Sequence, residues 1–337
     1  MRRVTLQDVA ADAGVSRAAA SMVVRGTGRL SDQTRERVRQ SMEKLGYIYN
    51  RNAASLRSNR SWTLGFIVTD FSNPYFSAIA LAFEKAASAA GYMTLISNTF
   101  DDPGQQDRLV TTMLESPVAG LAYVPALGAA AVDLPIPTLA LTRPAADEGP
   151  ALSSDAYAAG EMAAEHLVGV HGFRRIAYLG GAAAAVPTRE RIAGVRAVMS
   201  RHADATLAAV VHGQTSIDGG ARLAEELLQS GAEFDAVICH SDVIAYGVLR
   251  ALHDAGLGLG RIGVTGFDSL AASEVFIPSI TSVSVGTADL GRLAAEWLIR
   301  AVDDDTIQAP LPLAPYLDVR ESCGCTVSRE HPALITA

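Results

Sequence analysis

Apolar side chains recur with helical spacing in the first fifty residues, and this pattern predicts three short helices. Leu6, Val9 and Ala10 fall on one face of the first helix. Thr5 is expected to begin that helix, because its hydroxyl can accept a free backbone amide while Asp8, three residues on, reaches back in a capping box.

A tight turn at residues 13–16 is expected to separate the first two helices. Gly14 allows the left-handed backbone that such a turn needs, and Ser16 is placed to cap a helix over residues 17–24. The predicted buried stripe is Ala20, Val23 and Val24, and the predicted outward face is Arg17, Ala18, Ser21, Met22 and Arg25.

The third helix is expected to start at the cap Ser31, to run through Thr34, Val38, Met42 and Leu45, and to end at Gly46. Two short helices across a glycine turn, supported by a third, form a helix-turn-helix, which can lay one helix in the major groove of DNA.

From Trp62 onwards, short apolar strands alternate with helices. The first series of strands is expected at 63–70, 92–98, 120–125 and 138–142, with helices such as 75–90 and 106–114 between them. The second series is expected at 174–181, 207–213, 235–240 and 261–268, with helices at 156–168, 189–200, 217–230 and 243–255. Such alternation favours parallel sheets covered by helices, and two series predict two lobes.

Charge divides the chain in the same place. Residues 1–60 contain 12 Lys or Arg against 5 Asp or Glu, a balance of +7, whereas the remaining 16 basic residues face 31 acidic ones, a balance of −15. A basic head on an acidic body is expected where only the head contacts a polyanion.

The chain of 337 residues is long enough for two or three compact units. No stretch approaches about 18 uninterrupted apolar residues, so no membrane span is expected. The segment MRRVTLQDVAADAG lacks the apolar core of a signal peptide, and a cytoplasmic location is expected. Cys239 is interpreted as a buried thiol. Cys323 and Cys325 stand one residue closer than a C-x-x-C knuckle, so a chance pair is favoured over a metal site or a disulfide.

The strings VTLQDVAADAGVSRAAASMVVRG and SDQTRERVRQSMEKLGYIYNRNAASLRS resemble the headpiece of the LacI/GalR family of bacterial repressors, and the resemblance extends through nearly the whole chain. It implies an N-terminal all-α helix-turn-helix headpiece and an α/β two-lobed, periplasmic-binding-protein-like core of two parallel sheets flanked by helices. The implied domains are a headpiece at 1–49, a hinge helix or linker at 50–60, and a core for effector binding and dimerisation at 61–337.

The resemblance also divides the core. Lobe 1 is expected at about 61–156 and 286–317, and lobe 2 at about 157–285 and 318–327. The late strand near 282–285 and the helix at 287–301 are expected to return the chain to the first lobe.

The resemblance implies DNA contacts both to phosphates and to bases. Phosphate contacts are expected from Ser16, Ser31, Thr34, Tyr47 and Asn50, and base contacts from Arg17, Ala18 and Ser21. Arg17 could bind guanine with two hydrogen bonds, and Ala18 could offer a methyl group to thymine. The other expected contacts are Thr5, Leu6, Met22, Arg25 and Ala53. Met22 and Arg25 depart from the arginine and asparagine that many members carry, so the resemblance does not fix the operator sequence, and phosphate is the alternative contact for Arg25.

Residues 50–57 resemble the hinge helix of the family, which is marginal in isolation and folds on DNA. In the family, the leucine at the position of Leu56 is wedged between base steps and kinks the duplex. A plain linker is the alternative.

Ligands of open α/β sheets bind at the carboxyl ends of the strands, so a cleft between two lobes is the expected effector site. Its expected residues are Phe71, Tyr75, Phe76, Thr142, Arg191, Gln214, Ser241 and Asp268. Arg191 matches an arginine that bridges ligand oxygens in the family, and Asp268 suits paired hydroxyls. The alternatives are a surface charge for Arg191 and packing at a helix start for Tyr75 and Phe76. Asp242 is interpreted as a helix cap rather than a ligand.

Three enzyme motifs searched for are missing: no phosphate loop, H-E-x-x-H or G-x-S-x-G occurs. A transport solute-binding protein would not need the basic head. An architectural DNA-binding protein whose core no longer senses a ligand is a further alternative, and only a ligand test separates it from a regulator. The sequence therefore predicts a non-enzymatic, cofactor-free repressor that binds double-stranded, pseudo-palindromic operator DNA as a homodimer. A coiled-coil tail for tetramers is not expected. The predicted effector is a sugar or sugar derivative, with a nucleoside or nucleobase corepressor as the alternative.

Overall fold

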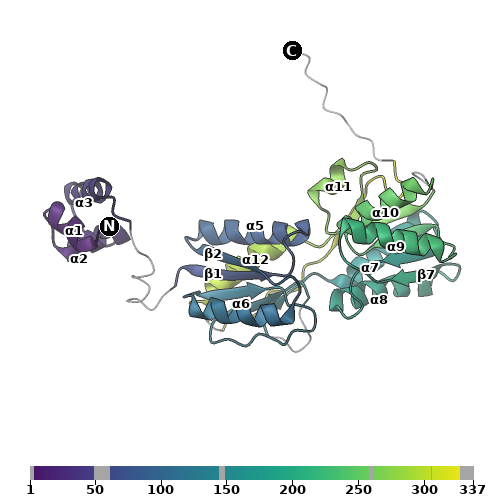
Figure 1. Cartoon of the computed structure of the whole chain (residues 1–337), viewed down its shortest axis with the longest axis horizontal. Coiled ribbons are helices and arrows are strands. Elements are labelled where there is room, and N and C mark those ends of the chain that lie inside the picture. Colours follow the sequence, from purple (N-terminus) through teal and green to yellow (C-terminus); the bar gives the residue numbers. More distant parts are fainter. Residues whose placement is uncertain (1–3, 49–60, 144–148, 258–260, 305, 327–337) are drawn as a thin grey trace, which may run out of the picture. The chain divides into compact units, whose positions relative to one another are not determined.

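The structure is a computed structural model that describes residues 4–48, 61–143, 149–257, 261–304 and 306–326. Residue contacts divide the chain into two compact units, Met1–Trp62 and Thr63–Ala337 (Figure 1). No helix of the described ranges is both long and apolar enough to cross a membrane.

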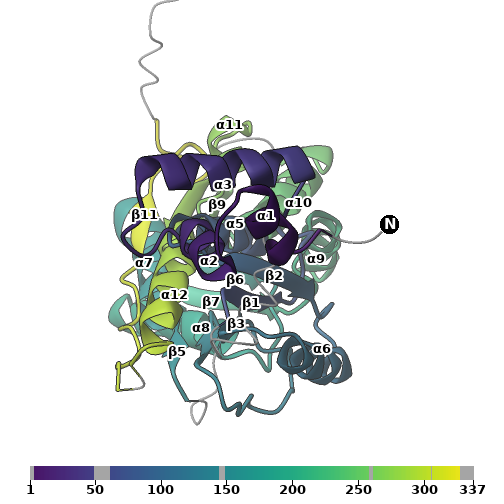
Figure 2. The same cartoon turned by 90° about the vertical axis from the view of Figure 1, so that its left-hand side faces the viewer.

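The first unit contains the three expected helices, α1 (Leu6–Asp12), α2 (Arg17–Arg25) and α3 (Asp32–Leu45). Figure 2 shows α3 lying across α1 and α2. The capping box is confirmed, since the Thr5 amide donates to Asp8 at 2.9 Å and the Asp8 amide donates back to the Thr5 hydroxyl at 3.4 Å. Ser16 and Ser31 cap α2 and α3 as predicted.

Five small or branched side chains form the centre of this unit: Val9, Ala10, Ala13, Ala20 and Val38. Val23 packs against them, but Val24 does not join this cluster. The prediction that Val24 belongs to the buried stripe of α2 is therefore wrong. The Ser41 hydroxyl donates to the Val9 carbonyl at 3.1 Å, which ties α3 to α1.

The second unit contains two sheets. The first has the order β2-β1-β3-β4-β5, with all neighbours parallel. Its strands are β1 (Thr63–Val68), β2 (Met93–Asn98), β3 (Gly120–Tyr123), β4 (Thr138–Leu141) and β5 (Ala151–Leu152). Helices α5 (Pro74–Ala89) and α12 (Thr287–Ala301) cover one face, and α6 (Pro103–Glu115) covers the other (Figure 1).

The second sheet has the order β11-β10-β9-β8-β6-β7, in which only the edge strand β11 is antiparallel. Its strands are β6 (Arg175–Leu179), β7 (Thr206–Val211), β8 (Ala236–Cys239), β9 (Gly263–Phe267), β10 (Thr281–Ser284) and β11 (Tyr316–Asp318). Helices α7 (Ala156–Glu165) and α8 (Val186–Arg201) cover one face, while α9 (Ile217–Gln229) and α10 (Asp242–Asp254) cover the other. A π-helical turn, His166–Val170, continues α7, and α11 (Ala271–Val275) is a single short turn. The predicted fold class, two mainly parallel sheets flanked by helices, is confirmed.

One expectation is wrong. The strand near 282–285 does not return to the first lobe, because β10 pairs with β9 and continues the second sheet, with Ser282 opposite Gly266. The connection through α11 is short, and β9 would otherwise leave a row of backbone groups without partners on that side. Only α12 returns, where Leu290, Trp297 and Leu298 enter the core of the first lobe.

The chain crosses between the lobes three times, and the crossings contact one another. The Leu313 amide donates to the Ser153 carbonyl at 2.8 Å, and the Asp155 amide donates to the Leu313 carbonyl at 3.0 Å. A Cβ added to Gly286 would lie 2.8 Å from the Leu313 side chain, so the second crossing runs against the third. The three crossing segments therefore form one joint between the lobes.

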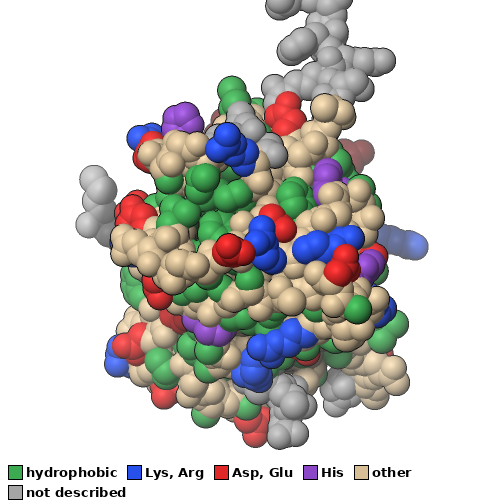
Figure 3. Space-filling model, turned by 90° about the vertical axis from the view of Figure 1, so that its right-hand side faces the viewer, with side chains coloured by type: hydrophobic (Ala, Val, Ile, Leu, Met, Phe, Trp, Pro, Cys, Tyr) green, Lys and Arg blue, Asp and Glu red, His purple; other side chains and the backbone are tan. Residues whose placement is uncertain are grey.

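Figure 3 shows one end of the second lobe, where acidic and basic side chains are interspersed rather than gathered by sign. Ion pairs of this lobe include Arg174–Asp204 at 2.6 Å and Arg201–Glu161 at 2.7 Å. This face lacks the concentrated positive charge that a DNA backbone attracts.

Candidate functional site

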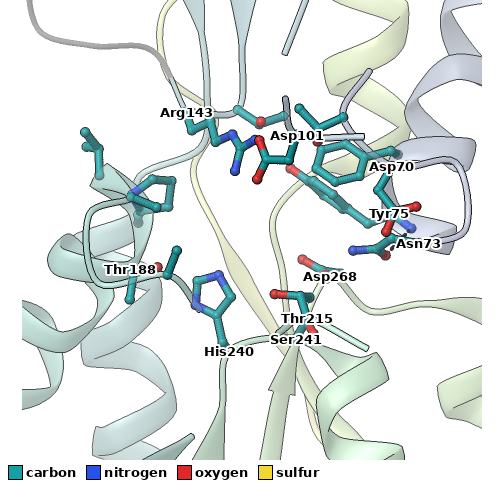
Figure 4. Close-up of a pocket in the computed structure, with 18 of the residues that line it drawn as sticks. Asp70, Asn73, Tyr75, Asp101, Arg143, Thr188, Thr215, His240, Ser241 and Asp268 are labelled. Atoms are coloured by element: carbon teal, nitrogen blue, oxygen red, sulfur yellow. Dashed lines mark hydrogen bonds and ion pairs between the residues drawn. The ribbon is translucent and has the colours of Figure 1, made fainter. Parts of the chain in front are cut away.

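A cavity of about 920 Å³ lies between the two lobes of the core, at the carboxyl ends of the parallel strands (Figure 4). The first lobe contributes the segments that follow β1, β2 and β4, and the second lobe those that follow β6, β7, β8 and β9. Its size and position suit a small molecule held by loops of both sheets.

An aromatic pair forms part of the first-lobe wall. Asn73 caps α5 by accepting the Tyr75 amide at 3.0 Å. This fixes the first turn of the helix, where the rings of Tyr75 and Phe76 meet edge to face at 5.1 Å. Both residues line the cavity, whereas Phe71, which was predicted with them, is exposed and does not. The reason is local, since the 70–73 turn folds on itself when Asp70 accepts the amide and hydroxyl of Ser72.

An ion pair that the sequence analysis missed stands beside them. Arg143 pairs with Asp101, and its Nε donates to the Pro125 carbonyl at 2.7 Å. Asp101 also accepts the Leu127 amide at 2.9 Å and has a φ of +59°. Both residues follow directly or closely on strands of the first sheet, so the rule that ligands gather at strand ends could have found them.

Arg191 is the central cation of the second-lobe wall. It lies on helix α8 rather than at the end of a strand, and it is only 6% exposed. One Nη donates to the His240 carbonyl at 2.6 Å, and Cζ lies 4.1 Å from the centre of the Phe267 ring. The guanidinium is thus held by a hydrogen bond and a cation–π contact. The surface-charge alternative is excluded by this burial.

A glycine sets the position of Arg191. A Cβ added to Gly160 on α7 would lie 2.1 Å from the Arg191 carbonyl oxygen. Helices α7 and α8 therefore touch backbone to backbone at this level, and the resulting contact places the arginine against the cavity.

Asp268 follows β9, lies against the cavity, and is buried with a φ of +97°. Burial raises the pKa of its carboxyl to about 7; Arg191 opposes this shift and Asp242 adds to it. A strained backbone at a ligand cleft is a recurring feature of functional sites. The charge of Asp268 therefore changes near neutral pH.

Asp242 has a different role from the one predicted. The N-cap of α10 is Ser241, whose hydroxyl accepts the Ile244 amide at 3.4 Å. The fully buried Asp242 carboxylate accepts three hydrogen bonds at 2.6 to 2.8 Å, from Leu270, Ser273 and Ser282. It therefore fixes the loop that carries Asp268, and the helix-cap interpretation of Asp242 is wrong because the preceding serine supplies the cap.

The other predicted cavity residues differ in their setting. Thr142, Gln214 and Ser241 line the cavity, but Gln214 is exposed and Ser241 is committed to its helix. His240 was not predicted. Its Nδ1 lies 2.8 Å from the Tyr178 hydroxyl, and burial lowers the pKa of the imidazole well below its usual range, so the ring is neutral. Figure 4 shows His240, Thr188 and Asp268 facing Arg143 and Tyr75 across the cavity.

The predicted DNA contacts fall into separate groups in the first unit. Arg17 and Ala18 are exposed on α2, while Ser21 and Met22 are half-buried. The thioether of Met22 lies over Gly28, 2.4 Å from where a Cβ would stand. Leu6 and Tyr47 pack against the core, and Thr5, Ser16, Ser31 and Thr34 stand at helix starts. The Arg25 side chain and residues Asn50, Ala53 and Leu56 lie outside the described part of the structure.

Comparison with known proteins gives the same two-part division. The model of the bacterial regulatory proteins of the lacI family matches residues 5–50, and a periplasmic binding protein-like domain matches residues 164–323. The maltose regulon regulatory protein MalI of Escherichia coli (strain K12) is 30% identical over 300 residues, which cover 86% of this chain and 85% of that protein. The ribose operon repressor of Halalkalibacterium halodurans is 29% identical over 326 residues, 94% of this chain and 96% of that protein.

Solved structures agree. The lac repressor dimer bound to operator and the anti-inducer ONPF matches with a TM-score of 0.85 at 25% identity, over 96% of this chain and 99% of that one. The CelR–cellobiose complex matches with a TM-score of 0.69 at 27% identity, over 95% of this chain and 100% of that one.

A helix-turn-helix headpiece and a two-lobed core with a cleft define a DNA-binding transcriptional regulator with a periplasmic-binding-protein-like effector domain. The chain belongs to the LacI family of bacterial regulatory proteins. Its relatives are regulators of transcription and not enzymes.

Proposed function

We propose that this regulator is a repressor that binds a pseudo-palindromic operator as a homodimer and responds to a sugar-like effector in the interlobe cavity. One observation carries the proposal: two charged walls face each other across the cavity. Arg143 and Asp101 form the wall of the first lobe, and Arg191 with Asp268 forms that of the second.

The chemistry of the cavity favours a polyhydroxylated ligand. Carboxylates accept hydrogen bonds from hydroxyls and guanidinium groups donate to them, so each wall can bind neighbouring hydroxyls of a sugar ring. Tyr75 and Phe76 supply the apolar faces on which a ring packs. The names of several similar proteins refer to ribose, maltose or cellobiose, which supports the same class of ligand.

Effector binding would act by shifting a population of two core arrangements. A ligand that contacts both walls binds the closed arrangement of the lobes more tightly than the open one, and this difference in affinity limits the shift. Closure moves the subunit surfaces of a homodimer and changes the spacing of its two headpieces. A symmetric dimer matches a two-fold site, so this spacing decides operator affinity.

The effector half of the proposal is tested by thermal unfolding of the full chain with sugars, glycosides, sugar phosphates and nucleosides. A ligand at a hundredfold excess over its Kd stabilises the folded state by about 2.7 kcal/mol. We expect a selective sugar to raise the unfolding temperature of the wild type and of Arg196→Ala, an exposed arginine on the same helix α8. Arg191→Ala and Asp268→Ala should lose the shift while remaining folded. A shift from nucleosides alone would replace the sugar in the proposal.

The DNA half is tested by selecting duplexes from a random pool with the full chain. Arg17→Ala should cost about 1–3 kcal/mol of binding free energy and relax the preference at one base position of each half-site. Arg37→Ala, exposed on α3, should leave the preferred sequence unchanged. An unaltered preference in Arg17→Ala would remove that side chain from base recognition.

A further inference from the structure

Four side chains with metal-binding atoms meet at the end of the second sheet opposite the effector cavity. His166 Nε2 lies 3.2 Å from Cys323 Sγ and 3.8 Å from Cys325 Sγ, and His171 Nε2 lies 3.2 Å from Cys325 Sγ. The four ligand atoms all lie within 4.8 Å of one another. None of these residues lines the effector cavity, and the regulator function described above does not use them.

These distances are close to those of a tetrahedral zinc site. Zn–S bonds of about 2.3 Å and Zn–N bonds of about 2.0–2.1 Å give tetrahedron edges of roughly 3.3–3.8 Å. Small side-chain rotations would bring every pair into that range. Two thiolates and two imidazoles in a tetrahedral arrangement select Zn²⁺ over hard cations such as Mg²⁺ and Ca²⁺.

The two histidines are brought together by an unusual helix ending. After Glu165 the helix widens into the π-helical turn His166–Val170. Hydrogen bonds of a π-helix join residues five apart, so His166 and His171 lie on the same side of successive turns. Their rings are 4.9 Å apart at an angle of 78°. Such turns recur at functional sites, and here an ordinary α-helix would separate the two imidazoles around the axis.

The two cysteines come from the segment that follows β11. Gly324 stands between them with a φ of +99°, a conformation that only glycine adopts readily. The turn at this glycine brings both thiols to the His166 imidazole, and the Cys325 thiol also to that of His171. The C-G-C spacing that argued against a metal knuckle therefore fits a site whose other two ligands lie about 150 residues earlier in the chain.

The surroundings are those of a built site. Cys323 is fully buried and His166 is 8% exposed. The hydroxyl of the buried Thr281 on β10 donates to Cys323 Sγ at 3.0 Å. A donor on a ligating sulfur stabilises its thiolate form and orients the ligand, as outer partners of metal sites do.

We propose that His166, His171, Cys323 and Cys325 form a Cys₂His₂ site for one Zn²⁺ ion. Each thiol loses its proton to solvent as its sulfur binds the metal, so binding releases two protons and changes no oxidation state. Since the protein supplies all four ligands, no position is left open for substrate, and the site is structural. It fastens the segment after β11 to the end of α7.

The first experiment measures metal on the full chain, purified under reducing conditions from zinc-supplemented cells. We expect one zinc ion per chain. Replacement by Co²⁺ should give the d–d bands of tetrahedral cobalt and a thiolate-to-metal charge-transfer band. Cys325→Ser and His171→Gln should lose bound zinc and these bands. Cys239→Ala and His253→Gln, which change a cysteine and a histidine outside the cluster, should keep both.

The wild-type chain alone can overturn the proposal, so it does not depend on the folding of the variants. Failure to take up Zn²⁺ or Co²⁺ in reducing buffer, or cobalt bound without a thiolate band, would show that the four side chains are only hydrogen-bonded. A Cys323–Cys325 disulfide that persists until strong reduction, with no metal bound afterwards, would also exclude the site. Removal of zinc by a chelator should lower the unfolding temperature of the wild type and leave that of Cys325→Ser unchanged.

Discussion

Asp268 is the residue through which the charge of the cavity depends on pH. It lies in a strained backbone position, against a cation, and with a second carboxyl nearby. Burial raises its pKa to about 7 and that of Asp242 to about 6. Because the two carboxyls interact, their protons are shared between coupled steps rather than lost independently. The charge of the second-lobe wall therefore changes near neutral pH.

This shift predicts how stability depends on pH. The folded chain holds the Asp268 proton more tightly than the unfolded chain, whose carboxyl has its ordinary pKa of 3.8. The contribution of Asp268 to stability is thus greatest at low pH and falls as pH rises from about 4 to about 7. Asp268→Asn lacks this dependence, so its free energy of unfolding relative to wild type should increase over that window by up to a few kcal/mol.

Urea unfolding at pH 5 and pH 7.5 measures the difference. Asp107→Asn, an exposed aspartate on α6, controls for the substitution itself. A difference between Asp268→Asn and wild type that is the same at both pH values would show that the carboxyl is not perturbed in the folded protein.

At the scale of elements, the sequence indicated the long helices and the longer strands of the two sheets, but not the short edge strands β5 (Ala151–Leu152) and β11 (Tyr316–Asp318). Boundaries were harder where proline was involved: α8 begins at Val186 rather than 189, with Pro187 in its first turn. The pattern of apolar residues also could not show that His166–Val170 changes from α to π, because three consecutive residues, His166, Leu167 and Val168, are buried there and fit neither period better. Partners of strands were least accessible, and β10 was assigned to the wrong lobe for that reason.

The contact of α12 with α5 gives a prediction of its own. A Cβ added to Gly291 would lie 2.2 Å from the Ile79 carbonyl oxygen and 2.9 Å from the Ala82 Cβ. Gly291→Ala therefore forces the helices apart. Alanine favours helix by up to about 1 kcal/mol, but overpacking costs about 1–3 kcal/mol and occasionally more. We expect a net loss of unfolding free energy in urea.

The control is Glu296→Ala, on the exposed side of the same helix, which should change the unfolding free energy by less than about 1 kcal/mol. Equal stabilities of wild type and Gly291→Ala would mean that the two helices have room to adjust.

At the scale of the whole molecule, the two-lobed fold followed from the sequence and the sites did so only partly. Residues directly at strand ends, such as Asp268 and Thr142, could be predicted from the pattern and the family resemblance. Arg143 and Asp101 also follow strands of the first sheet, but the sequence does not show that their side chains form an ion pair beside the cavity. The His166–Cys325 cluster was missed because it depends on a helix defect and on chain segments far apart in sequence. The local periodicity of apolar residues carries no information on contacts between segments that are far apart in the sequence.

The three crossings have a consequence for synthesis of the chain on the ribosome. Neither lobe is continuous in sequence: the first needs Leu290, Trp297 and Leu298 of α12 for its core, and the second needs β11 and Cys323. The headpiece can fold as soon as it emerges, whereas the strands of the first lobe must wait for almost the entire chain. Both lobes then complete their cores within a few dozen residues of each other, so nascent chains spend most of translation with an unfinished first sheet that chaperones would have to protect.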